Sequence, residues 1–288
     1  MKSLITLSPE ESKRLIAKAI VQLPQVKTAK EKGIIGIARC TSGAYVVEEL
    51  IDRKLANKNG YCSGFFVAQG SCAVQTQDQE KLLVLSRGKE QWLTSEEGNI
   101  SKFIGNMNCH DIIIKSGNIL DCNGEAGTLV ASPSGGEIGS YLPHILAIGI
   151  QLIVPMTINK TVSDSLHTIV SSMGITKIEP SRCHGMPCGV IPLPGQIITE
   201  IHAIHLLTKA NALPVAVNGI GSGAGSVMLL IDGPRKYVDR AWEIIEKIKG
   251  EPPMADPLSP CDHCYLLKHP SQGVRCSTRK GRTLDTGK

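Results

Sequence analysis

The residues best suited to chemistry in this chain lie in its middle, where lysines, carboxylates and glycines follow short apolar segments. Lys115 and Lys160 can each bind a phosphate or carboxylate group as a positive point charge. Glu125 and Glu137 are candidate catalytic carboxylates. Either could act as a general base on a carbon next to a carbonyl, or as a nucleophile towards an acyl group, unless it simply faces solvent. These residue types predict a site for a small phosphorylated or carboxylated metabolite.

Further binding residues are expected between the two lysines. Asn118 follows an apolar strand, Asp121 could orient a substrate hydroxyl, and Gly135 and Gly136 lie in the small-residue loop 132–139. In an open α/β sheet, small anionic ligands bind where the strands end. The plainer alternative is that Asp121 belongs only to a turn.

A second polar turn, Arg39–Gly43, ends an apolar strand and leads at once into a helix. Free backbone N–H groups and the helix dipole favour an anion at such a helix start. Thr41 and Ser42 could add hydroxyl donors, and Gly43 permits close approach of the ligand; the alternative is an ordinary capped turn. Cys40 is either a nucleophile activated by the helix start or a small packed residue, with no histidine near it in sequence.

Strands that alternate with helices must position these groups. Ser8 followed by Pro9 and, three residues after Ser8, by Glu11 predicts a capped helix start. This alternation predicts an α/β fold with a doubly wound, mostly parallel sheet over residues 1–175. The expected strands are 33–38, 65–68, 82–85, 111–115 and 151–154, and the expected helices begin at 9, 44, 142 and 162.

The composition changes after residue 175, and a smaller unit is expected over residues 176–253. Its predicted order is strand, helix, strand, strand, helix, which is the order of a ferredoxin-like α+β domain. The predicted elements are the strands 190–193, 213–217 and 226–232 and the helices 196–210 and 236–248. The glycine-rich segment 218–226 leads into a strand, so it indicates a hairpin connection and not a dinucleotide-binding turn.

The first unit resembles the superfamily that contains ribose-5-phosphate isomerase, glucosamine-6-phosphate isomerase, the CoA-transferases and the effector domains of sugar-phosphate repressors. The likeness covers about residues 8–172 and rests on the element order of residues 9–55 and on the segments 111–117, 134–139 and 150–160. The resemblance implies an anion-binding fold with isomerase or CoA-transferase activity.

The chain departs from the pattern of that superfamily at three points. Arg39 and Cys40 stand in the phosphate turn where glycines are usual, Ile112–Ile114 replace an acidic pair, and Pro155 stands where an acidic residue is common. A non-catalytic metabolite sensor or regulatory protein is therefore the alternative to an enzyme. In either case we expect a homo-oligomer.

Ten cysteines in a chain without a recognisable signal peptide are expected to be reduced thiols. Residues 254–288 form an irregular, cysteine-containing basic tail, in which Cys261, Cys264 and Cys276 could bind zinc. Zinc binding through these C-terminal cysteines is a further functional alternative.

Composition restricts the partners. Residues 268–288 contain six basic residues and one acidic residue, so the formal net charge of +5 lies in the tail and not on a binding face of the body. Aromatic residues make up only 3%, which makes nucleic acid an unlikely partner. No apolar run reaches the length of a membrane span, and we expect a cytoplasmic protein without a membrane partner.

Overall fold

The computed structural model describes residues 1–67, 70–73, 80–94 and 100–254, and it confirms the predicted α/β class. Its largest sheet has the strand order β12-β10-β7-β2-β5-β6. The first four strands in this order run parallel to one another, β5 pairs antiparallel with β2, and β6 pairs antiparallel with β5, so the sheet is mixed. These strands are β2 (Ile34–Ile37), β5 (Leu82–Ser86), β6 (Lys89–Leu93), β7 (Ile112–Ile114), β10 (Gln151–Pro155) and β12 (Gln196–Ile198).

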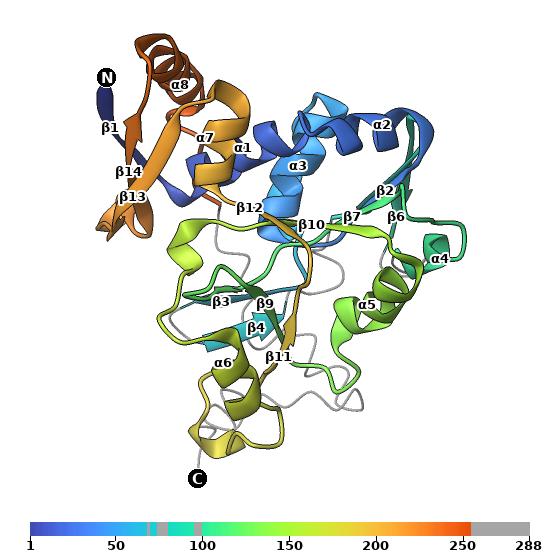
Figure 1. Cartoon of the computed structure of the whole chain (residues 1–288). Helices are drawn as coiled ribbons and strands as arrows, with labels where there is room; N and C mark the ends of the chain where they lie inside the picture. The colour runs from blue at the N-terminus through green and yellow to red at the C-terminus, as the bar shows by residue number, and fades with distance from the viewer. Residues whose placement is uncertain (68–69, 74–79, 95–99, 255–288) are drawn as a thin grey trace.

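Both faces of this sheet are buried, because successive side chains of its strands enter different cores. In β7, Ile112 and Ile114 belong to one hydrophobic cluster and Ile113 to the other. The helices α1 (Pro9–Ile20), α2 (Pro24–Lys32) and α3 (Thr41–Ile51) pack into the first cluster. The helices α4 (Ser101–Ile104) and α5 (Gly136–Ile148) pack into the second, on the opposite side of the sheet (Figure 1).

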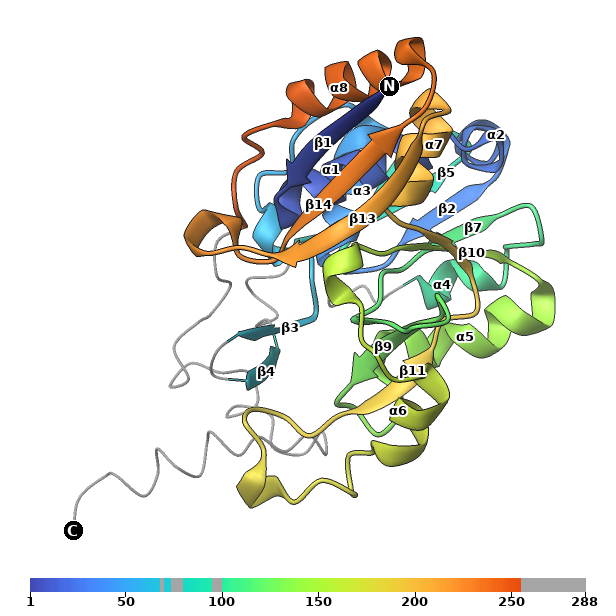
Figure 2. The same ribbon diagram turned by 60° about the vertical axis from the view of Figure 1, so that its left-hand side comes forward.

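A separate antiparallel sheet joins distant parts of the chain in the order β1-β14-β13. Its strands are β1 (Lys2–Leu7), β13 (Asn211–Asn218) and β14 (Ser226–Asp232), and the last two form the predicted hairpin. The helices α7 (Glu200–Thr208) and α8 (Arg235–Ile248) contribute to the core beneath it, and Figure 2 shows α8 beside this sheet.

The strand expected at residues 190–193 lies in another sheet. Strand β11 (Gly189–Pro192) pairs with β9 (Ala126–Val130), which in turn pairs with β8 (Ile119–Leu120). In the sheet that contains β13 and β14, the third strand is β1, whose Ile5 and Leu7 are buried in the core. A two-stranded hairpin, β3 (Gly64–Val67) and β4 (Gly70–Ala73), and the helix α6 (Leu166–Ser172) complete the described elements that bear on the site.

Several helix starts differ from the sequence-based expectation, since α3 begins at Thr41 and not at 44, and α6 begins at Leu166 and not at 162. Helix α5 begins at Gly136 and not near residue 142, so Pro143 lies inside the helix. Residues 196–198, expected as helix, form the edge strand β12, and α7 begins only at Glu200. By contrast, the capping box of α1 is present as predicted, with Ser8 and Glu11 each bonding the backbone N–H of the other.

A buried ionic network connects α1, α3 and the segment after α8. The guanidinium of Arg14 pairs with Glu48, with Glu49 at 2.9 Å and with Glu251 at 2.8 Å. Its side chain is only 4% exposed and stacks over the ring of Tyr45 at 4.8 Å. Because burial removes the hydration of these charges, each depends on its partners in the network.

Among the described residues, no helix combines the length and apolar character that crossing a bilayer requires.

We expect the substitution Arg14→Met to destabilise the protein by about 3–5 kcal/mol, because it leaves buried carboxylates without their partner. Urea denaturation followed by circular dichroism measures the change. Arg53→Met is the matched control, since the Arg53–Glu90 pair lies on the surface with Arg53 54% exposed, and it should change the stability little. Equal effects of the two substitutions would contradict the role of the buried network.

The network also predicts how stability depends on pH. Burial opposes ionisation of Glu251, but hydrogen bonds from Arg14 and Lys58 outweigh it and lower the pKa of Glu251 to about 2, from 4.5. The ionised carboxylate therefore stabilises the folded state above about pH 4.5, and this contribution is lost as the pH falls towards 2. Urea titrations between pH 2 and 7 should show a weaker acid dependence for Glu251→Gln than for the wild type. Glu243→Gln, on the exposed side of α8, should leave that dependence unchanged.

Candidate functional site

The carboxyl ends of three adjacent parallel strands meet at one cavity of about 560 Å³. Arg39–Thr41 follow β2, Lys115–Asn118 follow β7, and Lys160 lies in the turn after β10. The pairing of β7 with β10 continues to Lys115, because the backbone N–H of Lys115 donates to the carbonyl of Ile153 at 3.1 Å. The sequence-based expectation that the charged groups gather at strand ends is met by this arrangement.

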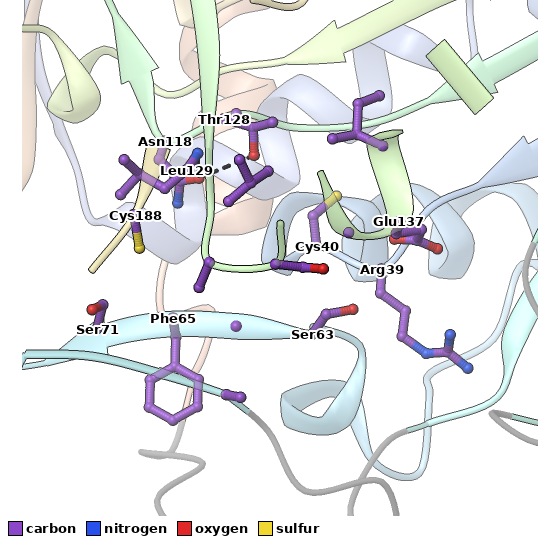
Figure 3. A pocket seen from close by; sticks show the side chains of 18 of the residues that line it. Arg39, Cys40, Ser63, Phe65, Ser71, Asn118, Thr128, Leu129, Glu137 and Cys188 are labelled. Atoms are coloured by element: carbon purple, nitrogen blue, oxygen red, sulfur yellow. Dashed lines mark hydrogen bonds between the residues drawn. The ribbon is translucent and has the colours of Figure 1, made fainter. Parts of the chain in front are cut away.

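The remaining walls come from outside the main sheet. The hairpin β3–β4 contributes Ser63, Phe65 and Ser71, which lie on the lower side of the cavity in Figure 3. Strand β9 and the loop that follows it contribute the opposite wall, where Thr128 donates a hydrogen bond to the side chain of Asn118 at 3.2 Å.

Lys115 and Glu137 form a pair within the cavity wall. The Lys115 ammonium lies 3.6 Å from Oε2 of Glu137 and donates a hydrogen bond to the carbonyl of Arg39 at 3.0 Å. Both oxygens of Glu137 are buried, yet they accept no hydrogen bond from the described residues. A buried carboxylate normally has such donors, so Glu137 retains unused capacity to bind a proton or a ligand donor.

Tyr141 lies one helical turn after Glu137 on α5 and is fully buried. Burial, together with the charge of Glu137, raises the pKa of Tyr141 well above its ordinary value. Its hydroxyl therefore stays protonated, and it has no hydrogen-bond partner among the described residues. Glu137 and Tyr141 thus form a carboxylate and a hydroxyl group on one face of the helix.

Lys160 is the second cation of the cavity. Its ammonium donates hydrogen bonds to Oγ of Ser116 at 3.0 Å and to the carbonyl of Gly117 at 2.9 Å. Burial, reinforced by the positive charge of Lys13, lowers the pKa of Lys160 from 10.5 to about 8. Lys160 can therefore exist in part as the neutral amine near neutral pH.

Cys40 caps the amino end of α3 and lines the same cavity. Its sulfur accepts hydrogen bonds from the backbone N–H groups of Gly43 at 3.2 Å and Ser116 at 3.4 Å. The thiol also donates a hydrogen bond to the carbonyl of Ala38 at 3.4 Å, so backbone groups from three segments hold the Cys40 side chain in place.

The loop before α5 needs glycine at specific positions. Gly135 and Gly136 have φ values of 79° and 61°, in the left-handed region that favours glycine. A Cβ atom on Gly139 would lie 2.1 Å from the carbonyl oxygen of Ser134. These glycines let the chain turn sharply from β9 into α5 and bring Glu137 to the cavity.

The structure brings together seven of the eleven residues proposed from sequence. They are Thr41, Lys115, Asn118, Gly135, Gly136, Glu137 and Lys160. Ser42, Gly43, Asp121 and Glu125 do not line the cavity. Ser42 is buried within α3, Gly43 donates its backbone N–H to the sulfur of Cys40, and Glu125 is exposed in the turn between β8 and β9.

Asp121 has a different position from the one expected of a substrate ligand. It is buried and accepts backbone N–H bonds from Asn123 and Glu125 in its own turn and from Leu166 at the start of α6. Burial opposes its ionisation, but these hydrogen bonds lower the pKa of Asp121 below its ordinary value. Its carboxylate therefore fastens α6 to the turn, as the plainer alternative proposes.

Sequence reasoning did not assign several cavity residues to the site. Phe65 and Ser71 lie on a short hairpin that has no recognisable motif, Ser63 directly precedes this hairpin, and Cys188 directly precedes β11. Asn118 gave the better signal, because it lies in the polar turn that follows β7, next to strands that also end in polar residues.

Within the described residues, no group of three or more His, Cys, Asp or Glu side chains is placed to hold a metal ion. Cys261, Cys264 and Cys276, the candidate zinc ligands, lie outside the described residues.

Comparison of the chain with protein-family models, with curated proteins and with solved structures found no match. The resemblance to the sugar-phosphate isomerase and CoA-transferase superfamily therefore stays a prediction.

The two carboxylates of the β8–β9 turn allow a sharp comparison. We expect Asp121→Ala to destabilise the protein by about 1–3 kcal/mol, because buried backbone N–H groups lose their acceptor. Glu125→Ala, the matched control, should change stability by less than about 0.5 kcal/mol. Urea denaturation measures both, and neither variant should lose a melting-temperature rise caused by a cavity ligand. Loss of that rise in a folded Asp121→Ala protein would instead place Asp121 in the binding site.

Proposed function

We propose that the cavity binds a small phosphorylated or carboxylated metabolite and that the protein acts on it as an isomerase. Glu137 would serve as the general base. The observation that carries this proposal is the buried carboxylate of Glu137, a residue of the cavity lining, which has no hydrogen-bond donor among the described residues apart from its ion pair with Lys115. A base needs a free oxygen near the substrate proton, and this side chain has two.

The cations and helix ends of the cavity support the choice of an anionic substrate. Lys115 and Lys160 contribute positive charge, and the amino ends of α3 and α5 both reach the lining. A helix amino end carries partial positive charge and favours bound anions. Lys115 is positioned to hold the anionic group, since the backbone carbonyl of Arg39 fixes its ammonium.

An isomerisation of this kind moves a proton between neighbouring carbons. Glu137 would remove the proton from the carbon beside a carbonyl and return it to the next carbon. The positive charge of Lys160, the second cation of the cavity, would stabilise the negative charge that develops on the carbonyl oxygen. Tyr141, whose hydroxyl remains protonated, lies one helical turn after Glu137 and is near enough for the charge of Glu137 to raise its pKa.

The same free carboxylate supports one second candidate, a CoA-transferase-like reaction. There the Glu137 oxygen would attack an acyl thioester and form an anhydride, and the CoA thiolate would leave. The two candidates differ in substrate, so acyl-CoA compounds belong in the same ligand screen as sugar phosphates and carboxylates.

The test combines ligand binding with turnover. A thermal-shift screen with sugar phosphates, acyl-CoA compounds and small carboxylates should give hits that raise the melting temperature. Glu137→Gln keeps the shape of the side chain, so it should retain the shift while turnover of the hit falls by at least about 100-fold. Lys115→Met should lose the shift because the cavity loses a cation. Lys236→Met, on the exposed face of α8, is the control and should behave like the wild type.

The outcomes separate the alternatives. Unchanged turnover in Glu137→Gln would remove Glu137 from the reaction. A shift that survives in Lys115→Met would place the anion elsewhere. Binding without turnover of any hit would favour the non-catalytic sensor.

A further inference from the structure

The two lysines of the cavity have different partners. Lys115 pairs with Glu137, whereas Lys160 forms no ion pair with a carboxylate of the described residues and donates only to neutral oxygens of Ser116 and Gly117. A half-buried ammonium without a counter-ion is destabilised relative to the neutral amine. Lys160 therefore differs from Lys115 in having a nitrogen suited to act as a nucleophile and not only as a charge.

The turn that carries Lys160 is held rigidly. Thr157 precedes the short 3-10 helix η3 (Ile158–Lys160), and its side chain is fully buried. The carboxylate of Glu200, at the start of α7, accepts the N–H of Ile158 at 3.0 Å. The Nζ of Lys160 is fixed by its hydrogen bonds to Ser116 and Gly117, which follow β7. The segments after β10 and β7, two adjacent strands, together set its position. Such preorganisation suits a residue that must meet a reacting atom.

The charges around Lys160 come from several elements. Lys13 on α1 and Lys115 after β7 disfavour its ammonium, whereas Cys40 before α3 and Glu200 on α7 favour it. The burial of Lys160 outweighs the attraction of Glu200, whose own charge is disfavoured because burial raises the pKa of Glu200 to about 6. The result is an amine that is about half neutral at pH 8. An ordinary lysine with a pKa of 10.5 is neutral there in only about three molecules per thousand.

We propose that Lys160 forms a covalent imine with the carbonyl group of an anionic aldehyde or ketone bound in the cavity. This inference rests on the proposed function for the anion site and narrows the substrate class to carbonyl compounds. The neutral Nζ attacks the carbonyl carbon, a C–N bond forms, and the carbonyl oxygen leaves as water with the two hydrogens of the amine. Imine formation is thus balanced without an oxidant or reductant.

An imine at Lys160 would also explain the role of the Glu137 carboxylate. When protonated, an imine withdraws electrons more strongly than the parent carbonyl, so a hydrogen on the adjacent carbon becomes more acidic. Glu137 lines the same cavity and could remove that proton. Lys115 remains available to hold the phosphate or carboxylate of the substrate.

The experiment uses pyridoxal 5′-phosphate as a probe, because it combines an aldehyde with a phosphate. The full-length protein is mixed with an equimolar amount of the probe at pH 8 and reduced with borohydride, and the adducts are located by peptide mass spectrometry. The adduct should lie mainly on Lys160, and its yield should fall at least tenfold as the pH is lowered from 8 to 6.5. Lys160→Arg keeps a positive charge and should lose this adduct, whereas the surface control Lys236→Arg should keep it.

An adduct on Lys115 or on surface lysines with none on Lys160 would overturn the proposal. The wild-type map alone decides this, even if Lys160→Arg fails to fold. Pyridoxal without phosphate, and competition by inorganic phosphate, test the anion site separately. If Lys160 reacts equally with both aldehydes and phosphate does not protect it, the imine chemistry stands and the anion-binding part of the proposed function fails. If phosphate raises the melting temperature but Lys160 stays unlabelled, the imine proposal alone fails.

Discussion

The position of helix α3 depends on one buried cation, the guanidinium of Arg14. It joins α1 to the carboxylates of Glu48 and Glu49 on α3 and to Glu251 beyond α8. A charge in this position is stable only when all its partners are in place, so the pairing tolerates little displacement of the three elements. The other end of α3 carries Cys40 and Thr41 into the cavity. The geometry of the site therefore depends on a contact that lies outside it, at the far end of the same helix.

The cavity itself follows from the direction of the strands. Because β10, β7 and β2 are parallel neighbours, residues from three distant segments emerge side by side at one edge of the sheet. The same geometry gives Lys115 and Lys160 separate surroundings. Lys115 forms an ion pair with a carboxylate, whereas Lys160 donates its hydrogen bonds to neutral oxygens. A single cavity thus contains one lysine that is paired with a carboxylate and a second lysine whose pKa is lowered to about 8 by burial.

The features that sequence predicted correctly depend on local physics. The capping box of Ser8 and Glu11 involves groups only three residues apart, and the charged strand ends follow from short apolar runs. The features that sequence missed depend on distant partners. The three residues of β12 form a strand only because β10 offers an open edge, and β11 pairs with β9 and not with its neighbours in sequence. Asp121 looked like a ligand because its real partner, the N–H of Leu166, is 45 positions away. Gly135 and Gly136 suggested a loop, although they form the start of α5.

The pairing of β1 with β14 constrains the order in which the chain can fold. The first residue bonds to Gly233, which is 232 positions away, and β1 has no other strand partner in the described structure. During synthesis on the ribosome, β1 emerges well before β14 and must wait for nearly all of the described chain before its partner exists. Closing so long a loop is slow and entropically costly, so this sheet forms late. Until then, the apolar side chains of Ile5 and Leu7 remain uncovered, and the nascent chain carries an exposed strand that chaperones could recognise.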